Sequence, residues 1–197
     1  MKKLPIPSLV VLLLTMSACG GGEAVENPLN PAGLTEEEIA AVAGQLEAAA
    51  TDATRSATGS PSSLAAPRSL TRTTPLGGQQ PCPLGGRITR SGNVTVTATE
   101  DGAWSVYGLV TFLISDPTNN LNDCEVAPDV LLDGSLTLAV AGTSEKGGVG
   151  ASLTGTIGIN RRGPTGGLIP RGDCNVFINV PVGATQATGS VCGRSIR

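Results

Sequence analysis

The spacing of the cysteines constrains the fold of this chain more than any other feature. Cys82 and Cys124 lie equidistant from position 103, next to the turn-forming pair Asp101-Gly102. If this turn is the tip of a β-hairpin, the two sulfurs face each other at its base, because opposed residues on neighbouring strands have Cβ atoms about 4.5 to 5.5 Å apart. The spacing therefore predicts a disulfide between Cys82 and Cys124.

A second pair of cysteines has the same arrangement. Cys174 and Cys192 lie equidistant from Gly183, which predicts a hairpin that turns at this glycine and a disulfide across its base. A closed sheet could instead bring Cys82 next to Cys192, so a long-range pairing remains an alternative.

The first of these hairpins has a clear strand pattern. Val94, Val96 and Ala98 alternate with threonines over residues 94–99, which is the two-residue period of a strand with one face turned to the core. In the return strand, Val106 and Val110 share one face, while Tyr107 and Leu109 share the other. Because both faces carry large apolar side chains, we expect this strand to be central and covered on both sides.

Residues 82–197 as a whole predict a mainly β domain. Further hairpins are expected around residues 142–148 and around Gly183, with no helical pattern between them. The composition suits a thin sheet core that disulfides support: 27 Gly, 15% charged residues, one Trp, one Tyr and two Phe. We expect an antiparallel meander of about six or more strands that closes into a barrel or folds into a sandwich.

One short helix is predicted before the sheet, over residues 34–50. Thr35 and Glu38 have the spacing of a capping box, and Leu34 and Ile39 that of a hydrophobic staple. Residues 51–81 are rich in Ser, Thr, Pro, Ala, Gly and Gln and poor in large apolar side chains, so they are predicted to be a linker.

The N-terminus has the features of an export signal. Residues 1–18 contain two lysines and an apolar run that is shorter than the roughly 20 residues needed to span a bilayer. Ser17 and Ala18 precede Cys19, and this segment resembles the signal of bacterial lipoproteins, in which small residues precede a lipidated cysteine. An ordinary leader or an uncleaved anchor is the alternative.

This resemblance has several implications. Cys19 would carry the lipid, palmitate included, residues 19–33 would be a lipidated tether, and four cysteines would remain for two disulfides. The protein would be exported and anchored to the bacterial membrane, either on the outer membrane facing the periplasm or on the cell surface. The Gly- and Thr-rich hairpins are similar to bacterial lipoproteins with an all-β exported domain, a likeness that implies no specific activity.

Several functions are disfavoured by composition. The chain has no histidine, which excludes Ser-His-Asp and Cys-His catalysis and histidine-ligated metals. Without Lys2 and Lys3 the formal charge falls from −3 to −5, and an acidic chain with few aromatics is a poor candidate for binding nucleic acid.

No catalytic, cofactor-binding or metal-binding residues are predicted. Oxygen-bearing side chains are frequent between Asp116 and Asp133, and Ca²⁺ takes such ligands. An EF-hand loop read from Asp116, however, has Leu121 where glycine is needed and Ala127 where the bidentate glutamate belongs. A solvated loop is the better interpretation.

These observations favour a lipid-anchored cell-envelope protein with a non-catalytic β domain that is structural or binds a partner. The expected partners are the membrane, through Cys19, and an unidentified envelope protein or apolar ligand; the oligomeric state stays open. The alternative is a carrier of small apolar ligands inside a β-barrel, which needs an interior cavity. A carboxylate-based hydrolase is the third possibility.

Overall fold

The structure is a computed structural model that describes residues 32–58, 69–114, 124–184 and 186–196. It contains one helix, α1 (Glu36–Thr58), and a nine-stranded antiparallel sheet. The strands are β1 (Leu70–Pro81), β2 (Arg87–Ala98), β3 (Trp104–Leu113), β4 (Cys124–Ala127), β5 (Val130–Thr143), β6 (Gly148–Arg162), β7 (Leu168–Val180), β8 (Thr188–Val191) and β9 (Arg194–Ile196). The prediction of a mainly β antiparallel meander with one N-terminal helix and two disulfides is confirmed.

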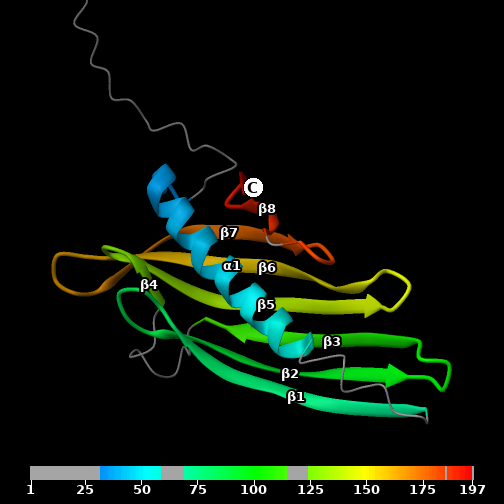
Figure 1. The fold of residues 1–197 in the computed structure, drawn as a ribbon. Helices are drawn as coiled ribbons and strands as arrows, with labels where there is room; N and C mark the ends of the chain where they lie inside the picture. The colour runs from blue at the N-terminus through cyan, green and yellow to red at the C-terminus, as the bar shows by residue number, and fades with distance from the viewer. Residues whose placement is uncertain (1–31, 59–68, 115–123, 185, 197) are drawn as a thin grey trace, which may run out of the picture.

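The sheet is open. Its strands follow the order β1-β2-β3-β5-β6-β7-β8-β9. The short strand β4 pairs with the first residues of β5, and β3 pairs with the later residues of β5 along the same edge. Within the described residues β1 and β9 are the two edges, so the sheet neither closes into a barrel nor packs on a second sheet. The helix α1 lies diagonally across one face instead (Figure 1).

The face under α1 holds the core, and we call it the inner face. Because side chains alternate along a strand, every second residue of each long strand points to this face. Phe112, Leu138, Leu153 and Ile178 are all buried here. The helix contributes mainly small side chains, including Ala49, Ala50 and Ala53, which let it lie close to the sheet. This narrow stripe is sufficient because the sheet supplies the large side chains.

The helix begins as the sequence predicts. The amide of Thr35 donates to Glu38 Oε2 over 2.8 Å, and the amide of Glu38 donates to Thr35 Oγ1 over 3.2 Å, which together form a capping box. Leu34 and Ile39 are both buried in the core cluster.

The predicted boundaries of the helix and linker are wrong. The helix does not end at residue 50 but continues to Thr58, since alanine is the best helix former and its alanines are buried against the sheet. Residues 70–81, predicted as part of a linker over 51–81, form the edge strand β1, so the domain begins well before residue 82. The amide of Cys82 donates to Gly86 O at the end of the β1–β2 ladder. Because backbone nitrogens along a strand point alternately toward and away from the neighbouring strand, those of Pro75 and Pro81 point away from β2. Prolines fit such an edge.

The two disulfides join the predicted pairs. Cys82–Cys124 and Cys174–Cys192 have Cα–Cα distances of 5.4 and 4.7 Å, and all four cysteines belong to the buried core. Cys174 on β7 and Cys192 after β8 lie across a hairpin, as expected: the amide of Cys192 donates to Asn175 O, one residue from Cys174.

The first disulfide spans a different geometry from the one expected. Thr89 pairs with Leu113, which centres the β2–β3 hairpin on Asp101 and not on position 103. Cys124 is not part of β3 but opens β4, and Cys82 lies in the turn between β1 and β2. The bond therefore ties this turn to β4 instead of closing the base of one hairpin.

Candidate functional site

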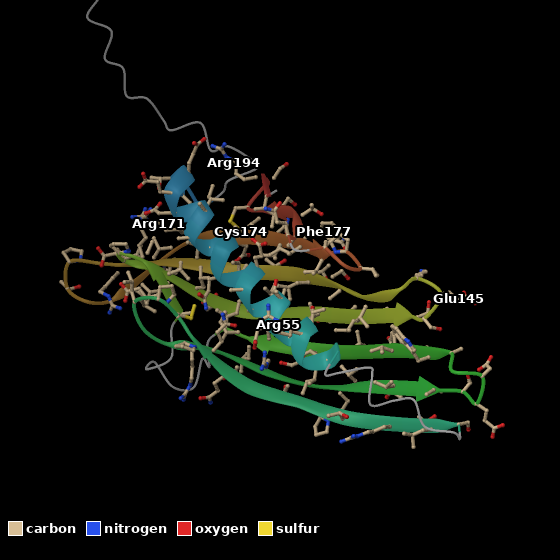
Figure 2. The ribbon with its side chains drawn as sticks, viewed as in Figure 1. Arg55, Glu145, Arg171, Cys174, Phe177 and Arg194 are labelled. Atoms are coloured by element: carbon tan, nitrogen blue, oxygen red, sulfur yellow. A yellow bond between two sulfur atoms is a disulfide. The ribbon has the colours of Figure 1, made fainter. Side chains whose placement is uncertain are left out.

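The face of the sheet opposite α1, which we call the outer face, is exposed over its central part. On β3 it carries Tyr107, Leu109 and Leu113, whose side chains are 62%, 50% and 41% exposed. The prediction that β3 is covered on both sides is therefore wrong. Phe177 is labelled on β7 in Figure 2; the strand register places it on this same face, and it is 50% exposed.

The central part of the outer face carries no charged side chain. This part, the central block, consists of the outward residues of β2, β3, β5 and β6 between the hairpin ends. The strand register brings the following residues together: Thr89, Ser91, Asn93, Thr95, Thr97, Ser105, Tyr107, Leu109, Thr111, Leu113, Ser135, Thr137, Ala139, Ala141, Thr143, Gly150, Ser152, Thr154 and Thr156. All are neutral, and most have a hydroxyl group.

An apolar patch lies within this block. Tyr107 pairs with Ala141, and Leu109 pairs with Ala139, so four apolar side chains form a square on β3 and β5. Gly150, opposite Ala141 on β6, adds no side chain, and the place that a Cβ would take there is bordered by Val180 O and Val182. An exposed apolar centre with a polar rim is the usual anatomy of a protein interface.

The polar side chains of the outer face form lateral hydrogen bonds. The hydroxyls of Thr73 on β1 and Thr95 on β2 are 3.0 Å apart, and Thr156 Oγ1 donates to Asn175 Oδ1 over 3.1 Å. Such cross-strand pairs stabilise the sheet. Because these groups already have a protein partner, covering them costs less free energy than covering unpaired hydroxyls.

Three of the four ion pairs among the described residues lie where the helix meets the sheet. Arg90 pairs with Asp52, Arg161 with Glu38, and Arg194 with Glu36, and each pair joins the sheet to α1. Figure 2 shows Arg194 near the N-terminal half of the helix. These three ion pairs therefore serve to dock the helix, and none of them involves a residue of the central block.

The best-buried of these pairs is Arg161–Glu38. Arg161 Nη2 lies 2.7 Å from Glu38 Oε2, and the two side chains are 26% and 15% exposed. Burial by itself raises the pKa of Glu38, but hydrogen bonds from the Thr35 amide and from Arg161, together with the charge of Arg161, lower it below its ordinary value of 4.5. Glu38 is thus an ionised cap that joins the helix to β6.

A shallow pocket of about 240 Å³ borders the central block at the hairpin tips. It is lined by Thr97, Thr99, Ala103, Trp104, Ser105, Thr143, Ser144 and Glu145. The amide of Trp104 donates to Ser144 Oγ, and the amide of Ser144 donates to Trp104 O, so the two hairpin tips are joined. The pocket is smaller than the roughly 300 Å³ at which small-molecule sites begin, and it extends the polar rim of the outer face.

A second small pocket, of about 210 Å³, lies between α1 and β9. Ile39, Ala40 and Ala43 line it from the helix and Ile196 from the strand, and the Glu36–Arg194 ion pair, 2.7 Å long, borders it. It belongs to the docking of the helix on the sheet edge.

The residues singled out from the sequence have separate locations. Cys19 and the oxygen-rich segment 116–123 lie outside the described residues. Beyond that segment, Glu125 accepts from the amide of Asp129 and pairs with Arg162, while Asp133 accepts from Asn160 Nδ2. No group of three or more His, Cys, Asp or Glu side chains in the described part of the chain could hold a metal ion.

The outer face was missed at the sequence level because large side chains at Tyr107 and Leu109 were interpreted as a second buried face. The signal that could have found it is the run of Thr and Ser on the paired strands, where a buried face would carry Val, Leu or Ile.

Comparisons with known proteins add no further constraint. The chain matches no protein-family model, no curated protein and no solved structure. Among the helices of the described residues, none has the length and apolar character needed to cross a membrane.

Proposed function

We propose that this chain is a lipid-anchored protein of the bacterial cell envelope whose β domain binds a partner and does not catalyse a reaction. The observation that carries the proposal is the outer face: its central block is neutral and rich in hydroxyl groups, Tyr107 and Leu109 are exposed within this block, and Phe177 is exposed beside it. Such a surface offers apolar anchors and hydrogen-bonding groups to a partner.

Export is supported by the disulfides. Both lie in the buried core, and structural disulfides persist in oxidising compartments such as the periplasm or the cell exterior. Anchoring follows from the resemblance of the segment before Cys19 to a lipoprotein signal.

A binding domain is favoured over a carrier of apolar ligands. A carrier needs an interior cavity, whereas the space between α1 and the inner face is filled by aliphatic side chains and by the two disulfides. The outer face, in contrast, has exposed apolar side chains that a partner can contact.

Membrane fractionation tests the anchoring. The wild-type chain is expected in the detergent phase of a detergent partition, and Cys19→Ala in the aqueous phase, because the variant has no thiol to acylate. Detection of the Cys19→Ala chain in the detergent phase would contradict the proposal.

Photo-crosslinking tests the binding face. With p-benzoylphenylalanine at Tyr107, the chain in its native membrane is expected to form a covalent adduct with the partner; at Leu84, which is 55% exposed in the turn between β1 and β2, it is not. Absence of any adduct from Tyr107 would contradict binding at this face.

A further inference from the structure

We propose that the partner of the outer face is a second copy of this chain, and that the two copies pack sheet against sheet. This inference rests on the proposed function, because it identifies the partner of the same surface. The two copies together would form the layered sandwich that a single chain does not complete.

The size of the outer face suits a stable dimer. Strands are about 4.8 Å apart and outward residues about 6.8 Å apart along a strand, so each outward position covers about 33 Å². The central block has five outward positions on each of β2, β3 and β5 and four on β6, so it covers about 650 Å²; β1 and β7 increase this to about 900 Å². A standard interface buries about 800 Å² per partner.

The charge of the face favours an identical partner. In a two-fold interface each patch meets its own copy, so a charged side chain near the axis meets a like charge. The central block has no charged side chain, although 15% of the chain is charged and four ion pairs occupy the helix contacts and the sheet ends. A neutral central block can meet its own copy without repulsion.

The composition of the face supplies anchors and a rim. Tyr107 and Leu109 with their partners Ala141 and Ala139 form an apolar centre. Tyr and Phe are typical anchors of protein interfaces, and Phe177 adds a ring two strands away from β5. The hydroxyls around this centre are partly paired with one another, which lowers the free energy needed to exclude water.

Among the described residues, no helix covers the central block on the outer side (Figure 1). Two sheets pack about 10 Å apart with strands about 30° from parallel, which requires a face free of covering elements. The helix and the start of the described chain at residue 32 lie on the inner side, so α1 does not obstruct the outer face (Figure 1). Anchoring both copies in one membrane raises their local concentration and favours a weak interface.

Photo-crosslinking of the full lipidated chain in native membranes tests this inference. With p-benzoylphenylalanine at Tyr107, the expected adduct contains peptides of this chain alone. Adding Leu109→Lys is expected to lower the adduct yield at least about tenfold, because it places like charges in a desolvated interface. Adding Leu84→Lys, which changes an exposed leucine outside the face, is expected to leave the yield unchanged.

Two results would overturn the inference. An adduct with another protein would show that the face binds a different partner, and the proposed binding function would stand without the dimer. A homodimer adduct whose yield is unaffected by Leu109→Lys would show that the copies meet elsewhere. Equal far-UV circular dichroism spectra of the Leu109→Lys and wild-type chains would show that the variant is folded, and Leu109→Asn serves as an uncharged second variant if the spectra differ.

Discussion

Removing the Cys82–Cys124 disulfide is expected to destabilise the domain severely. The bond joins residues 42 apart in the sequence and ties the turn between β1 and β2 to β4. The perturbation is the double variant Cys82→Ala/Cys124→Ala, which avoids leaving a single buried thiol. Gln45 Nε2 donates to Pro81 O beside this bond, so α1 also contacts the segment that the variant releases.

The magnitude follows from loop closure. A cross-link over 42 residues lowers the entropy of the unfolded chain enough to stabilise the fold by about 4 kcal/mol at 25 °C. For Cys174–Cys192, 18 residues apart, the same relation predicts about 3 kcal/mol. In a domain of this size about 4 kcal/mol corresponds to a fall of roughly 8 to 16 °C in the thermal midpoint.

Urea unfolding of the mature chain, followed by circular dichroism, measures this loss. We expect the free energy of unfolding to fall in the order wild type, Cys174→Ala/Cys192→Ala, Cys82→Ala/Cys124→Ala. A loss of less than about 1 kcal/mol in Cys82→Ala/Cys124→Ala would refute the reasoning, since it would mean that other contacts already hold the turn between β1 and β2 against β4.

Three further predictions concern the helix, the sheet and the anchor. Glu38→Gln should lower the free energy of unfolding by about 1 kcal/mol at neutral pH. Because the pKa of Glu38 is lowered in the folded state, this difference between the variant and the wild type should disappear in urea titrations as the pH falls below 4.5. A difference that persisted at low pH would contradict the prediction. Gly108→Ala should destabilise the domain by more than about 2 kcal/mol, because the added Cβ would lie 2.5 Å from Val94 Cγ2. Gly44→Ala in the helix should instead stabilise it by about 0.8 kcal/mol, because nothing lies within 4 Å of the added Cβ. Equal thermal midpoints for the two variants would contradict the close packing of β3 on β2. Intact-mass spectrometry of the mature chain should show a diacylated Cys19, and an unmodified Cys19 would exclude the lipid anchor.

The elements with strong local signals could be predicted from the sequence. The capping box at Thr35 and Glu38 depends on residues three apart, and the hairpins at Asp101-Gly102 and Gly183 depend on turn chemistry next to alternating side chains. Both cysteine pairs were correct. For Cys82 and Cys124 the expected geometry was wrong, because the chain inserts residues 115–123 between β3 and β4.

Features that depend on tertiary packing could not be predicted. The edge strand β1 has few large apolar residues because only Leu76 of its side chains is buried, so its composition resembles that of a linker. The last turns of α1 are alanine-rich because they lie close to the sheet.

The candidate site was only half visible in the sequence. Alternation correctly separates the outward threonines from the inward valines on β2. It cannot show whether the second face of β3 is covered, because Tyr107 and Leu109 fit either a buried layer or an interface between molecules.

Hydroxyl-radical footprinting of the chain in its native membrane tests the central claim, that the outer face is a contact surface. Oxidation of Tyr107 and Phe177 in the wild-type chain is expected to be at least about threefold slower than in Leu109→Lys, because side chains covered by an interface lose most of their accessible surface. Oxidation of Leu84, exposed outside this face, should be equal in both chains. Equal oxidation of Tyr107 and Phe177 in the two chains would contradict the account.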